Sequence, residues 1–253
     1  MIDLSSVTFL IPISIDNPDR EENLLSVIKY LDNNLDTNII IAENCCSPRL
    51  QYLKNIKNFK RITVPYDDVF HKTKVLNEAF KCSDTEYICS YDSDVFVPIE
   101  QFVQSLNMLK DNVCDFIITY DGTCYNVPRN HRLDLEANNF DLPINKFRKR
   151  RLNSLGGSVM FKSSVFMEGG MENENFKGWG GEDDERIHRF IKLGYRLERS
   201  HGALYHLDHI RSRDSIRIDS YYKKNLEELK KVSNMTKEKL SEYVRTWQWT
   251  KTK

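Results

Sequence analysis

The sequence contains no apolar run approaching the roughly 18 residues that a membrane-spanning helix needs. It also has no excess of one charge, because 37 Lys and Arg residues balance 37 Asp and Glu residues. This balance gives no indication of binding to nucleic acid or to an anionic membrane. The start of the chain lacks the basic leader of a secretory signal peptide. We therefore expect a cytoplasmic protein that binds no nucleic acid.

The six cysteines show no CxxC spacing, which argues against a structural zinc site or a dithiol motif. We expect them to be free thiols in a reducing compartment. Internal repeats and low-complexity linkers are also absent. With 253 residues, 40% of them hydrophobic, the chain is long enough to bury a sizeable core.

The first half of the chain alternates between strand-like and helix-like segments. Apolar, strand-like runs occupy 7–14, 38–44, 61–66, 86–94 and 115–120. Helical patterns begin at Pro18, Pro48, Lys72 and Pro98, and the second is expected to reach about Asn58. Strands separated by such helices predict parallel βαβ units with helices on both faces of one sheet. We therefore predict an α/β, Rossmann-like single domain with a mostly parallel central sheet, in which ligands bind beyond the carboxyl ends of the strands.

The second half is less regular. Residues 121–150 are polar and are expected to form a long loop with some helix, followed by a strand over 156–161 and short strands at 195–199 and 203–207. A helix is expected over 182–193, with Ile187, Phe190 and Ile191 facing inward and Gly194 ending it. Residues 219–245 predict one long amphipathic helix that ends near Trp247 and Trp249. This helix could pack on the domain, dimerise or contact a membrane surface.

Two acidic residues, Asp92 and Asp94, lie at the end of the fourth strand-like run, 86–94. Carboxylates two residues apart can converge on one hard divalent cation, and Mg²⁺ and Mn²⁺ prefer such oxygen ligands. Acids also end strands simply as turn residues, so this motif alone decides little.

A second candidate site lies downstream, where His206 and His209 flank Asp208. Two imidazoles three residues apart can face one metal ion, and a mixture of imidazole and carboxylate ligands suits Mn²⁺ better than Ca²⁺. Two ordinary hydrogen-bonded histidines are the simpler alternative.

The stretch GWGGEDDE, residues 178–185, places three glycines and Trp179 before four acids. Acids in the first turn of a helix are favoured by the helix dipole, which explains part of the block. The dipole does not explain an aromatic residue flanked by glycines, which is typical of a mobile segment that lies over a ligand. A carboxylate beside that aromatic face could accept a proton from a sugar hydroxyl.

A basic run, KFRKRR, covers 146–151. It fits a solvated helix face, or contact with a phosphate-bearing ligand or an anionic lipid head group.

Taken in order, these motifs resemble the GT-A glycosyltransferases, most closely the family that makes β-1,4-galactosyl linkages. The resemblance runs from about residue 8 to 213 and includes the segments IPISIDNPDREENL, FHKTKVLNEAF, DSDV, LGGSVMFKSSVFMEGG and HLDHIR. GWGGEDDE nearly repeats the family's Trp-Gly-Gly-Glu-Asp-Asp and is its most specific part.

The resemblance implies a metal site and a catalytic site. Asp94 and His209 match metal ligands, and His206 stands where many members have methionine, a departure that should favour Mn²⁺, with Mg²⁺ as the alternative. Asp183 matches the general base, with Glu182 and Asp184 binding hydroxyl groups of acceptor or donor.

The resemblance also implies a UDP-sugar as donor. Lys72 and Arg20 match donor-contacting arginines, and Trp179 matches the aromatic residue that closes over the donor. The full donor-binding set that we expect comprises Pro12, Ser14, Arg20, Glu43, Lys72, Lys74, Asp92, Ser93, Asp94, Ser154, Gly156, Gly157, Trp179 and Gly180.

The expected organisation follows from this match. Residues 1–215 would form the glycosyltransferase domain, with a nucleotide-binding half over 1–120 and an acceptor half over 121–215, and 216–253 would be a helical extension. The expected activity is inverting, Mn²⁺-dependent transfer of galactose or N-acetylgalactosamine from a UDP-sugar to a saccharide acceptor, in polysaccharide, capsule or lipid-linked oligosaccharide synthesis.

One departure bears on the donor. Ser154 stands where galactose-specific members place a tyrosine against the C2 substituent, so we expect UDP-GalNAc to be used at least as well as UDP-galactose. A retaining GalNAc transferase of the same architecture and a metal-dependent phosphohydrolase are the alternative enzymes, and a catalytically inactive sugar-binding module is the alternative outside catalysis. Without a membrane anchor in the sequence, we expect the protein to act in the cytoplasm, with peripheral contact to the inner membrane face left open.

Overall fold

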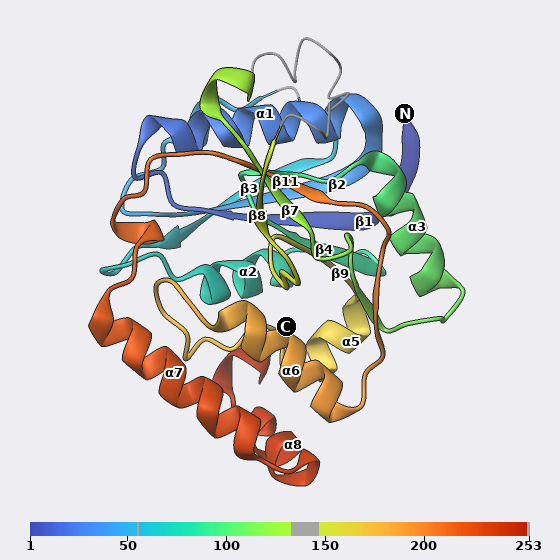
Figure 1. The fold of residues 1–253 in the computed structure, drawn as a ribbon, viewed down its shortest axis with the longest axis vertical. Helices are drawn as coiled ribbons and strands as arrows, with labels where there is room; N and C mark the ends of the chain where they lie inside the picture. Colours follow the sequence, from blue (N-terminus) through green and yellow to red (C-terminus); the bar gives the residue numbers. More distant parts are fainter. Residues whose placement is uncertain (55, 133–146, 252–253) are drawn as a thin grey trace.

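The computed structural model describes residues 1–54, 56–132 and 147–251 of the chain. Its fold is built around a seven-stranded sheet in the order β10-β6-β9-β4-β1-β2-β3 (Figure 1). These strands are β1 (Ile2–Ile13), β2 (Leu35–Cys45), β3 (Phe59–Pro65), β4 (Tyr87–Tyr91), β6 (Phe116–Ile118), β9 (Ser158–Lys162) and β10 (Leu197–Arg199). Only β9 runs antiparallel to its neighbours. The predicted α/β class with a mostly parallel central sheet is confirmed.

Helices cover both faces of this sheet (Figure 1). On one face lie α1 (Pro18–Asn34) and α3 (Ile99–Lys110), and on the other lie α2 (Lys72–Lys81), α5 (Ser163–Glu168) and α6 (Glu182–Leu193). Aromatic contacts mark the two layers: Phe9 meets Phe102 of α3 at 5.1 Å between ring centroids, whereas Phe161 meets Phe166 of α5 at 5.1 Å. Strand β4 and the carboxyl-terminal halves of β1 and β2 are almost entirely buried, as expected for parallel strands covered on both faces.

A second, four-stranded sheet was not expected from the sequence. Its order is β5-β11-β7-β8, formed by β5 (Val95–Phe96), β11 (Leu204–Leu207), β7 (Cys124–Val127) and β8 (Arg148–Arg151). The prediction of a long loop over 121–150 is therefore wrong where β7 and β8 form. The part of that segment over 133–146 lies outside the described residues. The basic run at 148–151 forms a strand rather than a helix face, because it pairs with β7.

Three further local predictions are wrong. The helix expected over 48–58 is only a 3₁₀ turn, η1 (Leu50–Tyr52), because Leu53 is extended and Asn58 adopts a left-handed conformation. Ile191 is 48% exposed, although Ile187 and Phe190 face inward as predicted. The single helix expected over 219–245 is broken into α7 (Asp219–Asn234) and α8 (Lys237–Arg245), because Met235 is extended and Thr236 caps the second helix.

The C-terminal helices pack beside α6 (Figure 1). Val232, Leu240, Val244 and Trp247 form a small buried cluster there. Arg189 of α6 is fully buried against the Trp247 ring, and its guanidinium donates to Glu185 and to the carbonyl oxygen of Met171. Of the options left open by the sequence, the structure therefore shows packing of this segment on the domain. Among the described residues, no helix combines the length and the apolar character that crossing a membrane requires.

The described residues also form the short 3₁₀ segments η2 (Arg129–His131), η4 (Arg213–Ser215) and η5 (Gln248–Lys251).

Candidate active site

A cavity of about 190 Å³ lies beyond the carboxyl ends of β1 and β4, where the second sheet and the start of α6 face them. In open α/β sheets this is the edge at which ligands bind. The cavity gathers most of the residues that the sequence singled out, although they come from distant parts of the chain. These residues are Pro12, Arg20, Lys72, Asp92, Ser93, Asp94, Ser154, Gly156, Gly157, Trp179, Glu182, Asp183, His206 and His209.

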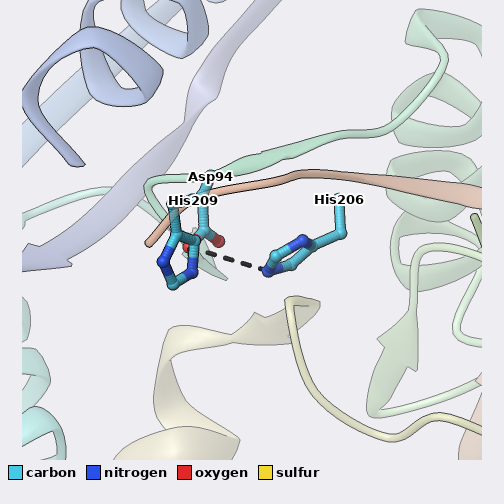
Figure 2. Close-up of side chains that lie close together, drawn as sticks. All are labelled: Asp94, His206 and His209. Carbon is cyan, nitrogen blue, oxygen red and sulfur yellow. Dashed lines mark ion pairs between the residues drawn. The ribbon is translucent and has the colours of Figure 1, made fainter. Parts of the chain in front are cut away.

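Three side chains in the cavity converge on one point (Figure 2). The Nε2 atoms of His209 and His206 lie 3.3 and 3.8 Å from Oδ2 of Asp94. One ligand atom from each of the three lies within 4.8 Å of the others. A carboxylate and two imidazoles at this spacing form a donor set that fits a divalent transition metal such as Mn²⁺.

The backbone explains why these three side chains meet. Asp94 lies in the turn between β4 of the large sheet and β5 of the small sheet, and β5 pairs with β11 so that Val95 is opposite His206. The carbonyl oxygen of Asp94 also accepts a hydrogen bond from the backbone N–H of Leu207 at 2.8 Å. Strand pairing therefore holds the first ligand beside the second, and the third follows in the next turn.

Electrostatics keep these groups in the forms that bind cations. Burial alone would raise the pKa of Asp94, but His206, His209 and Arg20 outweigh it and hold that pKa well below its usual range. Arg20 contributes through an ion pair of 3.1 Å to Oδ2. Burial lowers the pKa of His206 to about 4, so this imidazole is neutral at neutral pH and can donate a lone pair. Its Nδ1 atom is buried and has no hydrogen-bond partner among the described residues.

A second charged cluster lies across the cavity around Lys72, the first residue of α2. Its Nζ atom lies 2.9 Å from Oδ1 of Asp92 and 3.7 Å from Oδ1 of Asp183. Arg186, one turn along α6 and fully buried, donates to the same Asp183 oxygen at 2.8 Å and to Glu172 at 2.8 Å. Lys72 thus links the Asp92 side of the cavity to the acids at the start of α6.

Asp183 and its neighbour Glu182 are held in different states. Burial would raise the pKa of Asp183, but Lys72 and Arg186 together lower it, so the carboxylate is ionised. Burial and the charge of Asp183 raise the pKa of Glu182 to about 7. Glu182 accepts a hydrogen bond from the backbone N–H of Gly180 at 3.1 Å. Two adjacent carboxyl groups with separated pKa values are typical of functional sites.

The Trp179 segment is tied to the C-terminal helix α7. The Trp179 ring, 38% exposed, stacks on Tyr222 with 6.3 Å between centroids. Asn225 accepts from the backbone N–H of Lys177 and donates to the carbonyl oxygens of Lys177 and Gly180. One asparagine therefore holds both ends of the segment that carries the tryptophan.

Five expected site residues do not line the cavity. Ser14 lies beside it and donates to Asp214, and Gly180 lies in the Trp179 segment. Glu43 is fully buried and accepts hydrogen bonds from the backbone N–H groups of Arg49 and Leu50, which supports the η1 turn. Lys74 faces a small hollow beside His71 on the other side of α2, and Asp184 is exposed on α6.

Several cavity residues were not found from the sequence. Asp214 lines the cavity and accepts hydrogen bonds from Ser14, Tyr66 and the backbone N–H of Phe70, but no local pattern marked it. Arg186 does not line the cavity but donates to Asp183, and it could have been noticed because it lies three residues after Asp183 on the same face of a helix. Arg211 also lines the cavity. Arg150 and Arg151 line it too, and for their basic run contact with a phosphate-bearing ligand was one of the expected alternatives.

Comparison with known proteins agrees with this architecture. The family described as the N-terminal domain of galactosyltransferase matches residues 138–213. Human β-1,4-galactosyltransferase 1 is 28% identical over 142 residues, which cover 54% of this chain and 29% of the human protein, and the mouse protein gives the same figures. The matched region therefore covers less than a third of the length of these relatives.

Solved structures share the fold at low sequence identity. S. aureus TarS 1–349, in complex with UDP-GlcNAc, has a TM-score of 0.58 and 14% identity, covering 92% of this chain and 69% of that one. GalNAc-T7 with UDP, GalNAc and Mn²⁺ has a TM-score of 0.60 and 11% identity, covering 89% of this chain and 47% of that one. The chain thus has the GT-A glycosyltransferase fold.

Proposed function

We propose that this galactosyltransferase-like chain of GT-A fold transfers galactose or N-acetylgalactosamine from a UDP-sugar to a hydroxyl group of a saccharide acceptor, with inversion and with Mn²⁺ as cofactor. The observation that carries the proposal is the convergence of Asp94, His206 and His209 in one cavity with Asp183. A cation site and a candidate base that share a cavity are what transfer from a nucleotide-linked sugar requires. Under this proposal, residues 1–120 bind the nucleotide, 121–215 complete the acceptor side, and 216–253 form a supporting extension.

Asp94, His206 and His209 would hold the cation, which when bound neutralises charge on the diphosphate and on the departing UDP. Arg20 and Lys72 add positive charge at opposite sides of the same cavity. Trp179 would cover the sugar and exclude water, which limits wasteful hydrolysis of the donor.

Asp183 is the proposed general base. Its Oδ1 atom is engaged by Arg186 and faces Lys72, whereas Oδ2 points toward Gly156 at the cavity wall. The lowered pKa keeps the carboxylate ionised, so Oδ2 can accept the proton of an acceptor hydroxyl as that oxygen attacks the anomeric carbon. Glu182, the neighbour of Asp183 in the cavity, would bind a hydroxyl group of the donor or acceptor sugar. Asp184 is exposed on α6 and would bind a hydroxyl group of a substrate that extends over this helix.

The same lowered pKa supports one alternative. A carboxylate with a depressed pKa is a weaker base, and a retaining GalNAc transferase has no need of a base at this position. The anomeric configuration of the product, measured by NMR, distinguishes the two: a β linkage from an α-linked donor supports inversion, and an α linkage supports retention.

The direct test screens UDP-sugars for Mn²⁺-dependent binding by calorimetry, followed by an acceptor array with the best donor. Asp183→Asn should lower turnover by about 10²–10⁴-fold and leave UDP binding intact. Fast hydrolysis of the donor without any acceptor would instead favour the phosphohydrolase alternative. Unchanged function in Asp183→Asn would favour a binding module without catalytic activity.

A further inference from the structure

The edge strand β8 contains a bulge at the cavity. Along β7 and β8, Cys124 is opposite Arg151 and Tyr125 is opposite Lys149, so Arg150 is an extra residue without a partner in the register. Side chains in a regular strand alternate between the two faces. A bulge interrupts that alternation and can re-aim a side chain next to an active site. Here both Arg150 and Arg151, although adjacent, line the cavity.

These two guanidinium groups differ from Arg20 and Lys72 of the same cavity, because no acidic partner is found for them among the described residues. Arg20 is paired with Asp94 at 3.1 Å and Lys72 with Asp92 at 2.9 Å. Within 1–54, 56–132 and 147–251, no ion pair joins Arg150 or Arg151 to a carboxylate. Arg150 is half-buried and Arg151 is exposed, and burial lowers the pKa of Arg150. A partly buried cation without a counterion is costly, and an anionic ligand would remove that cost.

The charges of the two arginines act on different acidic residues of the cavity. The charge of Arg151 reaches Asp183 and adds to the effects of Lys72 and Arg186 on its pKa. The charge of Arg150 reaches Asp94, and both arginines act on Cys124 between them in the cavity lining. The pair therefore extends from the proposed base toward the cation site. A molecule that presents a hydroxyl group to Asp183 would bring its neighbouring substituents to Arg151.

We infer that Arg150 and Arg151 bind an anionic group, a carboxylate or a phosphate, carried by the acceptor saccharide. This inference rests on the proposed function, because it needs the acceptor to stand at Asp183. The donor diphosphate is a less suitable occupant, since Arg20 and the cation ligands already serve that side of the cavity. Guanidinium groups suit the acceptor role because their planar fork matches carboxylate and phosphate oxygens in a bidentate manner.

The test uses matched probes on the full chain saturated with Mn²⁺ and UDP. Methyl β-glucuronide is compared with methyl β-glucoside, and glucose 6-phosphate with glucose, by NMR titration. We expect at least one anionic probe to bind about 10- to 100-fold more tightly than its neutral partner, the range for hydrogen bonds to charged groups. The glucuronide and phosphate arms separate the two sources of negative charge. Equal affinity within both pairs would overturn the inference.

Variants of the same strand provide the controls. Arg151→Gln and Arg150→Gln should each remove most of the anionic preference, and Arg151→Lys should restore only part of it because the fork is lost. Arg148→Gln and Lys149→Gln remove the same charge from exposed residues outside the cavity and should leave the preference unchanged. Thermal unfolding of each variant checks that the strand still folds.

Binding of UDP alone is measured first, because it separates failure of the proposed function from failure of the inference about Arg150 and Arg151. If UDP and Mn²⁺ fail to bind the native chain, the proposed function fails. If they bind and Arg150→Gln and Arg151→Gln weaken UDP as strongly as the anionic probe, the two arginines serve the donor and the inference fails alone.

Discussion

The carboxylate of Asp183 lies against Cα of Gly156. A Cβ atom built at position 156 would stand 1.9 Å from Oδ2 of Asp183, far inside van der Waals contact. Gly156 does not have a positive φ angle, so the backbone conformation alone would tolerate another residue. The glycine is needed because the carboxylate approaches so closely, and the first Gly of the LGG turn thereby fixes the position of the proposed base.

Gly156→Ala should therefore displace Asp183 rather than unfold the protein. Misplacing a reacting group by about 1 Å can lower turnover by about 10²-fold. We expect a loss of this order in turnover, with UDP affinity and the unfolding temperature nearly unchanged. Steady-state kinetics, calorimetry and thermal unfolding check the three quantities. Full activity in this variant would mean that the base is not at Asp183.

The donor preference should depend on Ser154, which lines the cavity where a tyrosine would narrow it. Ser154→Tyr should shift the ratio of kcat/KM for UDP-GalNAc over UDP-galactose toward galactose, because the larger ring would occupy the space of the N-acetyl group. The expected change is about 10-fold or more, since a few excluded heavy atoms are worth roughly 1–3 kcal/mol. Ser154→Ala serves as the control of similar size, and an unaltered ratio in Ser154→Tyr would contradict the assignment.

Metal dependence should follow the two histidines. Loss of a residue that only hydrogen-bonds a metal ligand weakens metal binding by roughly 10–100-fold. His209→Ala removes a ligand itself, so it should weaken Mn²⁺ binding by more than this. His206→Met should have the smaller effect, because many members of the family that this sequence resembles carry methionine at this position. Electron paramagnetic resonance of free Mn²⁺ measures both affinities directly. Removal of the metal by EDTA should reduce UDP affinity in the native chain, and metal-independent UDP binding would refute the proposed cation site.

Helix α7 should control the Trp179 segment through Asn225 and Tyr222. Asn225→Ala removes three hydrogen bonds to Lys177 and Gly180, and Tyr222→Ala removes the surface on which Trp179 stacks. We expect both changes to raise the KM for the donor and to increase donor hydrolysis relative to transfer, because water enters the loosened site. Trp179 fluorescence quenching by acrylamide reports the loosening. Leu226→Ala, at an exposed position of the same helix, is the matched control.

Glu182 should make stability depend on pH in the absence of metal. Because its pKa is raised from 4.5 to about 7 in the folded state, the folded chain holds this proton more tightly than the unfolded chain. The associated stability is complete below about pH 4.5 and is lost as pH rises through about 7. Glu182→Gln mimics the protonated group and does not titrate. The free energy of unfolding of the variant minus that of the native chain should therefore increase between about pH 4.5 and pH 7 and stay constant above pH 7. Glu227→Gln, on the exposed face of α7, should show no such trend, and a constant difference for Glu182→Gln would contradict the shift.

The features that could be predicted from sequence are those with a local pattern. Alternating apolar strands and helices predicted the parallel sheet, and the topological rule then indicated the edge where Asp92 and Asp94 lie. The small sheet could not be predicted, because its strands have two to four residues and pair over long separations. The bulge at Arg150 depends on the register between β7 and β8, which no property of the basic run reveals.

The break between α7 and α8 is another such case. The amphipathic pattern over 219–245 continues without a proline or glycine, yet Met235 is extended and Thr236 caps a new helix. Packing of the Trp247 cluster against α6 stabilises two helices relative to one continuous helix. This packing is a tertiary effect that the local sequence pattern does not reveal. Residues with purely tertiary partners, such as Asp214, were missed for the same reason.

Within the described ranges, the chain passes three times from a strand of the large sheet directly into a strand of the small one, and the turn that carries Asp94 is the shortest of these connections. A cation held between that turn and the end of β11 would cross-link the two sheets. Its binding energy would then add to the cohesion of the whole molecule. Heat tolerance would accordingly rise and fall with the supply of divalent ions, even when no sugar is present.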